Sequence, residues 1–228
     1  MLLEHFPITI SEDEVLSERD LLKNHEAGLF MNDVKSVRWL IVHCSASRED
    51  RDYTVEQMLR DHKARGFRTI GYHFYIRRNG VVTQHRHLLE VGAHCRPYNR
   101  CSIGICYEGG LSSDGKPKDT RTKEQREQLL LLLMKLRKLF PDALIRGHSE
   151  MPGATPKACP CFCSSNEYSY LMFYPQMLDG CSSVSNLFSI CGLCFIFIIE
   201  FFIISSSKNN IPCCSNKSRT WVTPSCPA

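Results

Sequence analysis

The sequence predicts an α/β fold in which a single mixed central β-sheet is flanked by helices. Short apolar runs typical of buried strands alternate along the chain with segments whose apolar residues recur at helical spacing. The composition agrees, because 43% hydrophobic and 23% charged residues over 228 positions form an ordinary globular balance. This composition excludes collagen-like, low-complexity and wholly disordered chains, and the length excludes a small disulfide-stapled scaffold.

Four regions are predicted to supply the strands. Residues 39–42 and 102–107 are continuous apolar runs, as in strands that are buried on both faces. Residues 72–77 and 81–84 flank an Asn-Gly dipeptide, the preferred turn of a tight hairpin. A further short strand is predicted over residues 143–146, and a long irregular loop follows it.

Two helices are predicted from capping boxes. Thr54–Gln57 opens the first helix, and Gly66 is its C-terminal stop. Thr122–Gln125 opens the second, which Pro141 ends. The apolar residues of the second helix recur at helical spacing at Leu129, Leu132, Leu133, Leu136 and Phe140.

Charge and cysteine content divide the chain into three predicted parts. Residues 1–33 form an acidic extension with eight acidic and two basic side chains, and the domain is expected over residues 34–172. Residues 173–228 form an apolar, cysteine-rich tail: nine of the 13 cysteines lie in the last 70 residues, and six of these lie in the tail. Within the tail, residues 187–204 are almost entirely apolar and are interrupted by Glu200. This pattern leaves open a membrane segment or a stretch that is poorly folded or not authentic coding sequence.

The charge of the domain favours an anionic partner. Residues 34–178 hold 23 basic and 14 acidic side chains, a net charge of +9. We expect no nucleic acid partner, because no recognised binding motif accompanies the basic residues. No basic and apolar signal sequence opens the chain, so we expect a cytoplasmic protein whose early cysteines are free thiols. We also expect a monomer.

Two histidines and one cysteine stand where a metal site is plausible. His43 follows the strand over residues 39–42, His148 follows the strand over residues 143–146, and Cys159 comes eleven residues later. Strand ends are where α/β proteins commonly assemble sites. Two imidazoles and one thiolate suit a single zinc ion with a fourth position open to water. By spacing alone, two structural histidines and a buried thiol remain the alternative.

Six motifs in a fixed order resemble a known enzyme family. They are His43-Cys44-Ser45-Ala46, Gly71-Tyr72-His73-Phe74, Gly92-Ala93-His94 with Tyr98-Asn99, Ser102-Ile103-Gly104-Ile105, Arg146-Gly147-His148 and Lys157-Ala158-Cys159-Pro160. The series is similar to the phage-lysozyme-type N-acetylmuramoyl-L-alanine amidases, zinc enzymes that share their fold with peptidoglycan recognition proteins. The resemblance extends from about Val37 to Phe162.

The resemblance implies a reaction and a role for each matching residue. The substrate is peptidoglycan, and the bond cleaved joins N-acetylmuramic acid to L-alanine of the stem peptide. The implied zinc ligands are His43, His148 and Cys159, and the implied catalytic residues are Tyr72 and Lys157. His94 and Asn99 match groove positions, so we expect them to bind substrate. Such an enzyme would act on the cell wall after release, with membrane contact through the tail as an option.

Two other functions stay open at this stage. One is a peptidoglycan-binding module of the same fold without turnover, which loss of the cysteine ligand would indicate; Cys159 is present. The other is a cysteine hydrolase that uses Cys44 or Cys159 with a histidine, which alkylation would inactivate and chelators would not. In addition, the thiols of Cys161 and Cys163 follow Cys159 closely and are potential competitors for zinc.

Overall fold

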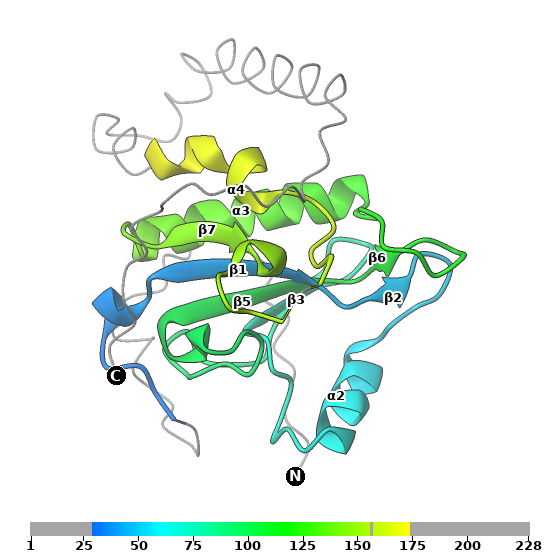
Figure 1. Cartoon of the computed structure of the whole chain (residues 1–228), viewed down its shortest axis with the longest axis horizontal. Helices are drawn as coiled ribbons and strands as arrows, with labels where there is room; N and C mark the ends of the chain where they lie inside the picture. Colours follow the sequence, from blue (N-terminus) through cyan, green and yellow to red (C-terminus); the bar gives the residue numbers. More distant parts are fainter. Residues whose placement is uncertain (1–28, 156, 174–228) are drawn as a thin grey trace. The chain divides into compact units, whose positions relative to one another are not determined.

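A five-stranded mixed sheet forms the centre of the protein, as predicted from the sequence. The computed structural model describes residues 29–155 and 157–173 (Figure 1). The strands are β1 (Trp39–Cys44), β3 (Phe74–Ile76), β4 (Val82–Gln84), β5 (Ser102–Tyr107) and β7 (Leu144–Gly147). Their order is β4-β3-β5-β1-β7, and β4 alone runs antiparallel to its neighbour in this sheet.

A second sheet of two short strands was not predicted from the sequence. β2 (Ser47–Arg48) pairs in parallel with β6 (Gly110–Leu111). Gly110 has a φ of +99°, and a Cβ at this position would overlap with Cys44 Sγ. Glycine therefore lets β6 pass close over the end of β1.

The helices begin at the predicted capping boxes. α2 (Val55–Ala64) is capped by Thr54, whose side chain accepts a hydrogen bond from the backbone N–H of Gln57. α3 (Lys123–Leu139) is capped in the same way by Thr122. The last helix, α4 (Ser164–Glu167), is a single turn. Short 3-10 turns complete the elements at η1 (Val34–Ser36), η2 (Tyr98–Cys101), η3 (His148–Glu150) and η4 (Ser169–Phe173).

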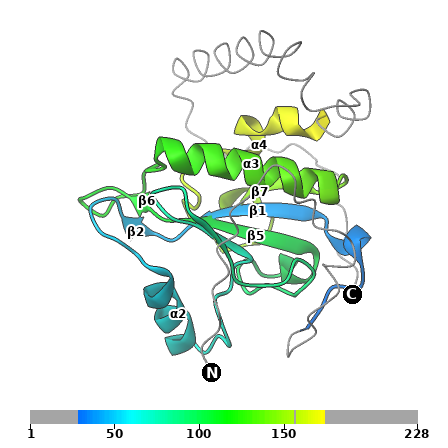
Figure 2. The same cartoon turned by 180° about the vertical axis from the view of Figure 1, so that it is seen from behind.

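The two longer helices lie on opposite sides of the central sheet (Figures 1 and 2). α2 packs Val55 and Met58 against Tyr75 and Cys106. Because Cys106 is the direct partner of His43 in the β1–β5 register, this is also the face that carries His43. Along α3 the predicted apolar positions are buried, namely Leu129, Leu132, Leu133 and Leu136. α3 thus packs on one face of the sheet and α2 on the other, the face that carries His43.

The end of the predicted acidic extension packs against the domain. Phe30 forms an isolated β-bridge with Glu90, and the backbone N–H of Met31 donates to the carbonyl of Leu89 at 2.7 Å. Met31 is buried. The rest of the extension and the tail, including residues 187–204, lie outside the described residues. Within the part that the structure describes, no helix combines the length and apolarity needed to cross a membrane.

A buried arginine holds the segment after Cys159 against the start of α3. The Arg121 guanidinium donates to Asp119, to both carboxylate oxygens of Glu167 and to the hydroxyl of Tyr168. Its Cζ atom also lies 3.3 Å from the centre of the Phe162 ring. These contacts position the chain that follows the loop carrying Cys159.

Candidate metal centre

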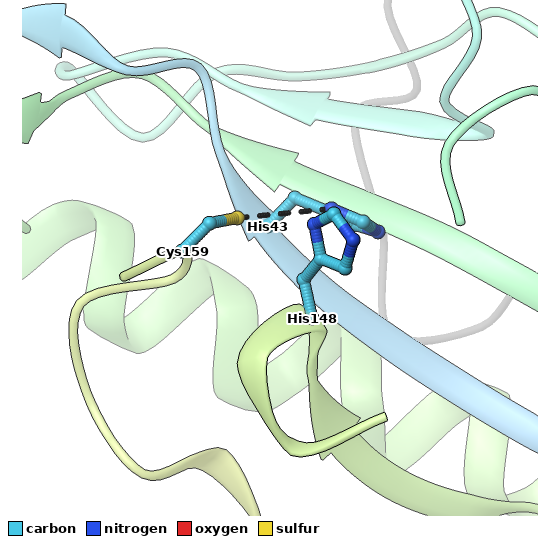
Figure 3. Close-up of side chains that lie close together, drawn as sticks. All are labelled: His43, His148 and Cys159. Atoms are coloured by element: carbon cyan, nitrogen blue, oxygen red, sulfur yellow. Dashed lines mark hydrogen bonds between the residues drawn. The ribbon is translucent and has the colours of Figure 1, made fainter. Parts of the chain in front are cut away.

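The structure brings His43, His148 and Cys159 together at one end of the sheet (Figure 3). His43 lies in β1, and His148 begins the turn η3 directly after β7. β1 and β7 are parallel neighbours, so their carboxyl ends meet at the same edge. The loop that follows η3 returns Cys159 to this edge, and its backbone at Cys159 accepts a hydrogen bond from Ser149 at 2.8 Å. Local turn structure therefore joins the second and third candidate ligands.

The separations within this cluster suit a tetrahedral ion. One ligand atom from each residue lies within 4.8 Å of the others, and Cys159 Sγ is 3.8 Å from His43 Nδ1. Ideal zinc–nitrogen and zinc–sulfur bonds at tetrahedral angles place such atoms ~3.5 Å apart. The mixed nitrogen and sulfur donor set is one that zinc prefers. The cluster therefore fits a zinc ion with three protein ligands.

Burial keeps the imidazole rings of His43 and His148 uncharged, which is the form that coordinates a metal. The pKa of His43 is well below its ordinary value because burial penalises the charged ring, and nearby His148 and Lys157 lower it further. The pKa of His148 is lowered by burial and by the positive charge of Lys157. Both rings are neutral at pH 7, with a lone pair available for coordination.

A cavity of about 230 Å³ opens over the cluster. All three candidate ligands line it, together with Tyr72, Lys157 and His94. None of its described lining residues is acidic, and Arg65 and Lys157 contribute positive charge. The cavity can therefore receive a group that carries or develops negative charge beside the candidate ligands.

Tyr72 lies beside His43, just before β3 begins. Its ring centre is 5.2 Å from that of His43 and 5.6 Å from that of His62. Burial raises the pKa of Tyr72 well above its ordinary value, so the phenol keeps its proton and can donate a hydrogen bond. His62 is buried behind it, where its Nδ1 accepts the backbone N–H of Gly71 at 3.0 Å. This contact fixes the chain next to Tyr72.

Lys157 lines the same cavity as Tyr72. The residue is exposed, and it lines the cavity two positions before Cys159. Its charge lowers the pKa of both His43 and His148, which places the ammonium group within electrostatic reach of the cluster.

The two predicted substrate-binding residues have different surroundings. His94 lines the cavity, and its Nδ1 is 3.0 Å from Nε2 of His43. Asn99 uses its side-chain oxygen to accept the backbone N–H groups of His94 at 2.9 Å and Cys95 at 2.8 Å. Asn99 thus supports the loop that carries His94. Direct contact of either residue with substrate stays a prediction.

The two additional thiols near Cys159 have partners of their own. Cys161 Sγ donates to the carbonyl of Gly110 at 3.2 Å, and it lies 4.0 Å from Cys44 Sγ. Cys163 Sγ donates to Glu150 Oε1 at 3.0 Å. Neither thiol belongs to the candidate metal cluster.

Glu150 is a structural residue of the site that the sequence analysis did not identify. Its carboxylate accepts hydrogen bonds from the backbone N–H of Gly147 and from the backbone N–H and the hydroxyl of Ser165. Through these bonds Glu150 connects the turn that carries His148 with the start of α4. The sequence signal was weak, because a capping box pairs such a glutamate with a Ser or Thr at the N-cap, and the cap residue here is Gly147.

Comparisons with known proteins agree on one family. A family described as N-acetylmuramoyl-L-alanine amidase matches residues 33–162. The endolysin of Enterobacteria phage K11 is 40% identical over 121 residues, which are 53% of this chain and 78% of the endolysin.

Two solved structures have a similar fold. The N-acetylmuramoyl-L-alanine amidase LysC from Clostridium intestinale has a TM-score of 0.51 at 23% identity, covering 65% of this chain and 93% of LysC. Bumblebee PGRP-SA has a TM-score of 0.51 at 18% identity, covering 66% of this chain and 90% of that protein. At these identities the likeness concerns the fold alone.

Proposed function

The chain belongs to the N-acetylmuramoyl-L-alanine amidase family, and from this membership we propose that it is a zinc-dependent peptidoglycan hydrolase. The bond cleaved is the amide between N-acetylmuramic acid and L-alanine of the stem peptide. One zinc ion per chain is held by His43, His148 and Cys159. The observation that carries the proposal is the convergence of these three side chains with Tyr72 and Lys157 on one cavity.

The residues around the cavity have complementary tasks. Zinc, when bound, supplies a Lewis acid that lowers the pKa of water and polarises a carbonyl group. Attack of water on the amide carbon moves negative charge onto the amide oxygen. The ammonium group of Lys157 stabilises that charge, and the cavity contains no acidic side chain among its described lining residues to oppose it. Tyr72 keeps its phenolic proton and donates a hydrogen bond to the water or to the oxyanion.

The remaining features of the proposal concern the whole chain. We take residues 34–172 as the amidase domain, acting as a monomer on the cell wall after release. The positive charge of this part of the chain favours an anionic wall polymer as partner. Residues 1–33 are an appendage in this proposal, and membrane contact through residues 187–204 stays a prediction.

The full chain incubated with purified peptidoglycan tests the proposed bond specificity. We expect new free amino termini of L-alanine and no increase in reducing sugar ends, with activity lost in a chelator and restored by zinc. New reducing ends would identify a glycosidase and contradict the proposal. Binding of peptidoglycan with no new amino termini would instead support a binding module. Inactivation by thiol alkylation without sensitivity to chelators would indicate a cysteine hydrolase.

A further inference from the structure

The two ring nitrogens of His43 face different partners. Nδ1 is the atom nearest the metal cluster, since it lies 3.8 Å from Cys159 Sγ. Nε2 faces away from the cluster and is 3.0 Å from His94 Nδ1. A neutral imidazole carries one proton, so the partner of Nε2 decides whether Nδ1 has a lone pair for a metal.

A chain of hydrogen bonds fixes the direction of this contact. It ends at the carbonyl of Tyr98, which only accepts, so the hydroxyl of Ser102 donates to it at 2.7 Å. Because the hydroxyl proton of Ser102 is donated to Tyr98, Ser102 Oγ accepts the N–H of His94 Nε2. This contact is the longest of the series at 3.5 Å. His94 Nδ1 is then without a proton and accepts from His43 Nε2. Nδ1 of His43 therefore carries no proton, and its lone pair is available on the side of Cys159.

The ring of His94 is tightly packed in this orientation. It lies on Gly104 in the middle of β5, where an added Cβ would be only 2.5 Å from the ring, and a Cβ at Gly92 would overlap with it as well. His73 packs edge-on against the ring at 5.8 Å between centres. Asn99 holds the backbone N–H of His94. The glycine in a central strand is therefore explained by the close approach of His94.

We propose that His94 is a positioning residue for the metal ligand His43. By accepting the proton of His43 Nε2, it selects the tautomer and the ring orientation that present Nδ1 to zinc. Such partners of metal-bound histidines commonly change metal affinity by about 10- to 100-fold. The inference deepens the proposed function, since it depends on zinc binding at this cluster.

Zinc affinity of the full chain tests this role without an activity assay. Competition with a metallochromic chelator is measured for the wild type, His94→Asn and His94→Gln. Asparagine places an oxygen acceptor close to the position of Nδ1, whereas glutamine carries its amide one methylene further out. We expect His94→Asn to stay within about 3-fold of the wild type and His94→Gln to bind zinc about 10- to 100-fold more weakly.

Thermal unfolding of the three zinc-free proteins serves as the control for folding. Equal affinities of His94→Asn and His94→Gln, whether unchanged or equally reduced, would overturn the proposal. If both variants bind zinc as tightly as the wild type but have a raised KM for peptidoglycan, His94 is a substrate contact instead. Absence of zinc binding by the wild type would contradict the proposed function itself, which keeps the two failures distinguishable.

Discussion

Three cysteines within five residues of the chain have three different environments. Cys159 joins the candidate metal cluster, Cys161 contacts the carbonyl of Gly110, and Cys163 contacts Glu150. Because thiolates coordinate zinc and the other two thiols are engaged elsewhere, one cysteine is expected to be essential for metal binding.

Substitution of single cysteines tests this assignment. We expect Cys159→Ala to lose stoichiometric zinc and amidase activity, because two histidines alone hold the ion weakly. Cys161→Ala is the matched control and should keep both. Zinc per chain, measured by atomic absorption, and release of L-alanine amino termini are the readouts. Loss of zinc in the control variant as well would show that the ligand set differs from the one proposed.

Tyr72 and Lys157 are expected to act on the reaction and not on the metal. Tyr72→Phe removes the donor and Lys157→Met removes the positive charge, so each should lower kcat about 100-fold with zinc content unchanged. Steady-state kinetics on soluble muropeptides, with zinc analysis of the same samples, is the measurement. A variant with normal kcat would exclude that residue from the chemistry.

His62 makes stability depend on pH. Burial lowers its pKa to about 4, whereas the unfolded chain takes up a proton near pH 6.5. The unfolded state therefore binds more protons below pH 6.5, and the free energy of unfolding falls as the pH drops from 6.5 towards 4. At pH 5 this residue should reduce the stability of the zinc-free protein by about 1–2 kcal/mol.

Urea unfolding of the zinc-free full chain at pH 7 and pH 5 measures this effect. His62→Asn is a suitable control, because asparagine still offers an acceptor to the N–H of Gly71 and does not titrate. The pH dependence should shrink by the same amount in the variant. An identical pH dependence in both proteins would refute the assignment to His62.

At the scale of elements, the buried Arg121 connects α3 with the segment that follows Cys159. Arg121→Met keeps much of the side-chain volume but removes the buried cation that Asp119 and Glu167 share, which leaves them only the half-exposed Arg126. We expect a loss of about 3 kcal/mol in stability, since the variant loses the buried partner of these ion pairs together with its hydrogen bonds to Asp119, Glu167 and Tyr168. Chemical denaturation measures this loss. Arg126→Met removes the half-exposed arginine that also pairs with Asp119. It should lower the free energy of unfolding by less than about 1 kcal/mol.

The elements with strong local signals could be predicted from the sequence. The central sheet, the hairpin and both capped helices were predicted, because apolar runs, an Asn-Gly turn and capping boxes are local features. The strands of the hairpin are shorter than expected, so Tyr72 precedes β3 and does not lie within it. The β2–β6 pair was missed, since two-residue strands have no periodicity to detect.

In the candidate site too, some features could be predicted from the sequence and others could not. His43 and His148 could be placed at strand ends from the sequence, and the resemblance added Tyr72, Lys157 and Cys159. The hydrogen bond between His43 and His94 could not be predicted, because the two residues are 51 positions apart and meet only through the packing of His94 on Gly104. Tertiary contacts of this kind have no sequence pattern.

At the scale of the molecule, the candidate metal centre depends on the complete topology. His43 and Cys159 are 116 positions apart, and they meet because β7 lies next to β1 and the following loop turns back. An ion held by such distant residues stabilises the folded chain over the unfolded one. Zinc binding, folding and activity are therefore expected to vary together.

The most direct test of the account is a zinc titration of the chelator-treated full chain. Bound zinc and the rate of L-alanine amino-terminus release from peptidoglycan are measured at each addition. We predict that activity rises in proportion to bound zinc and reaches its limit at one ion per chain. Full activity in protein free of zinc, or zinc binding that leaves activity unchanged, would contradict the assignment of a zinc-dependent amidase.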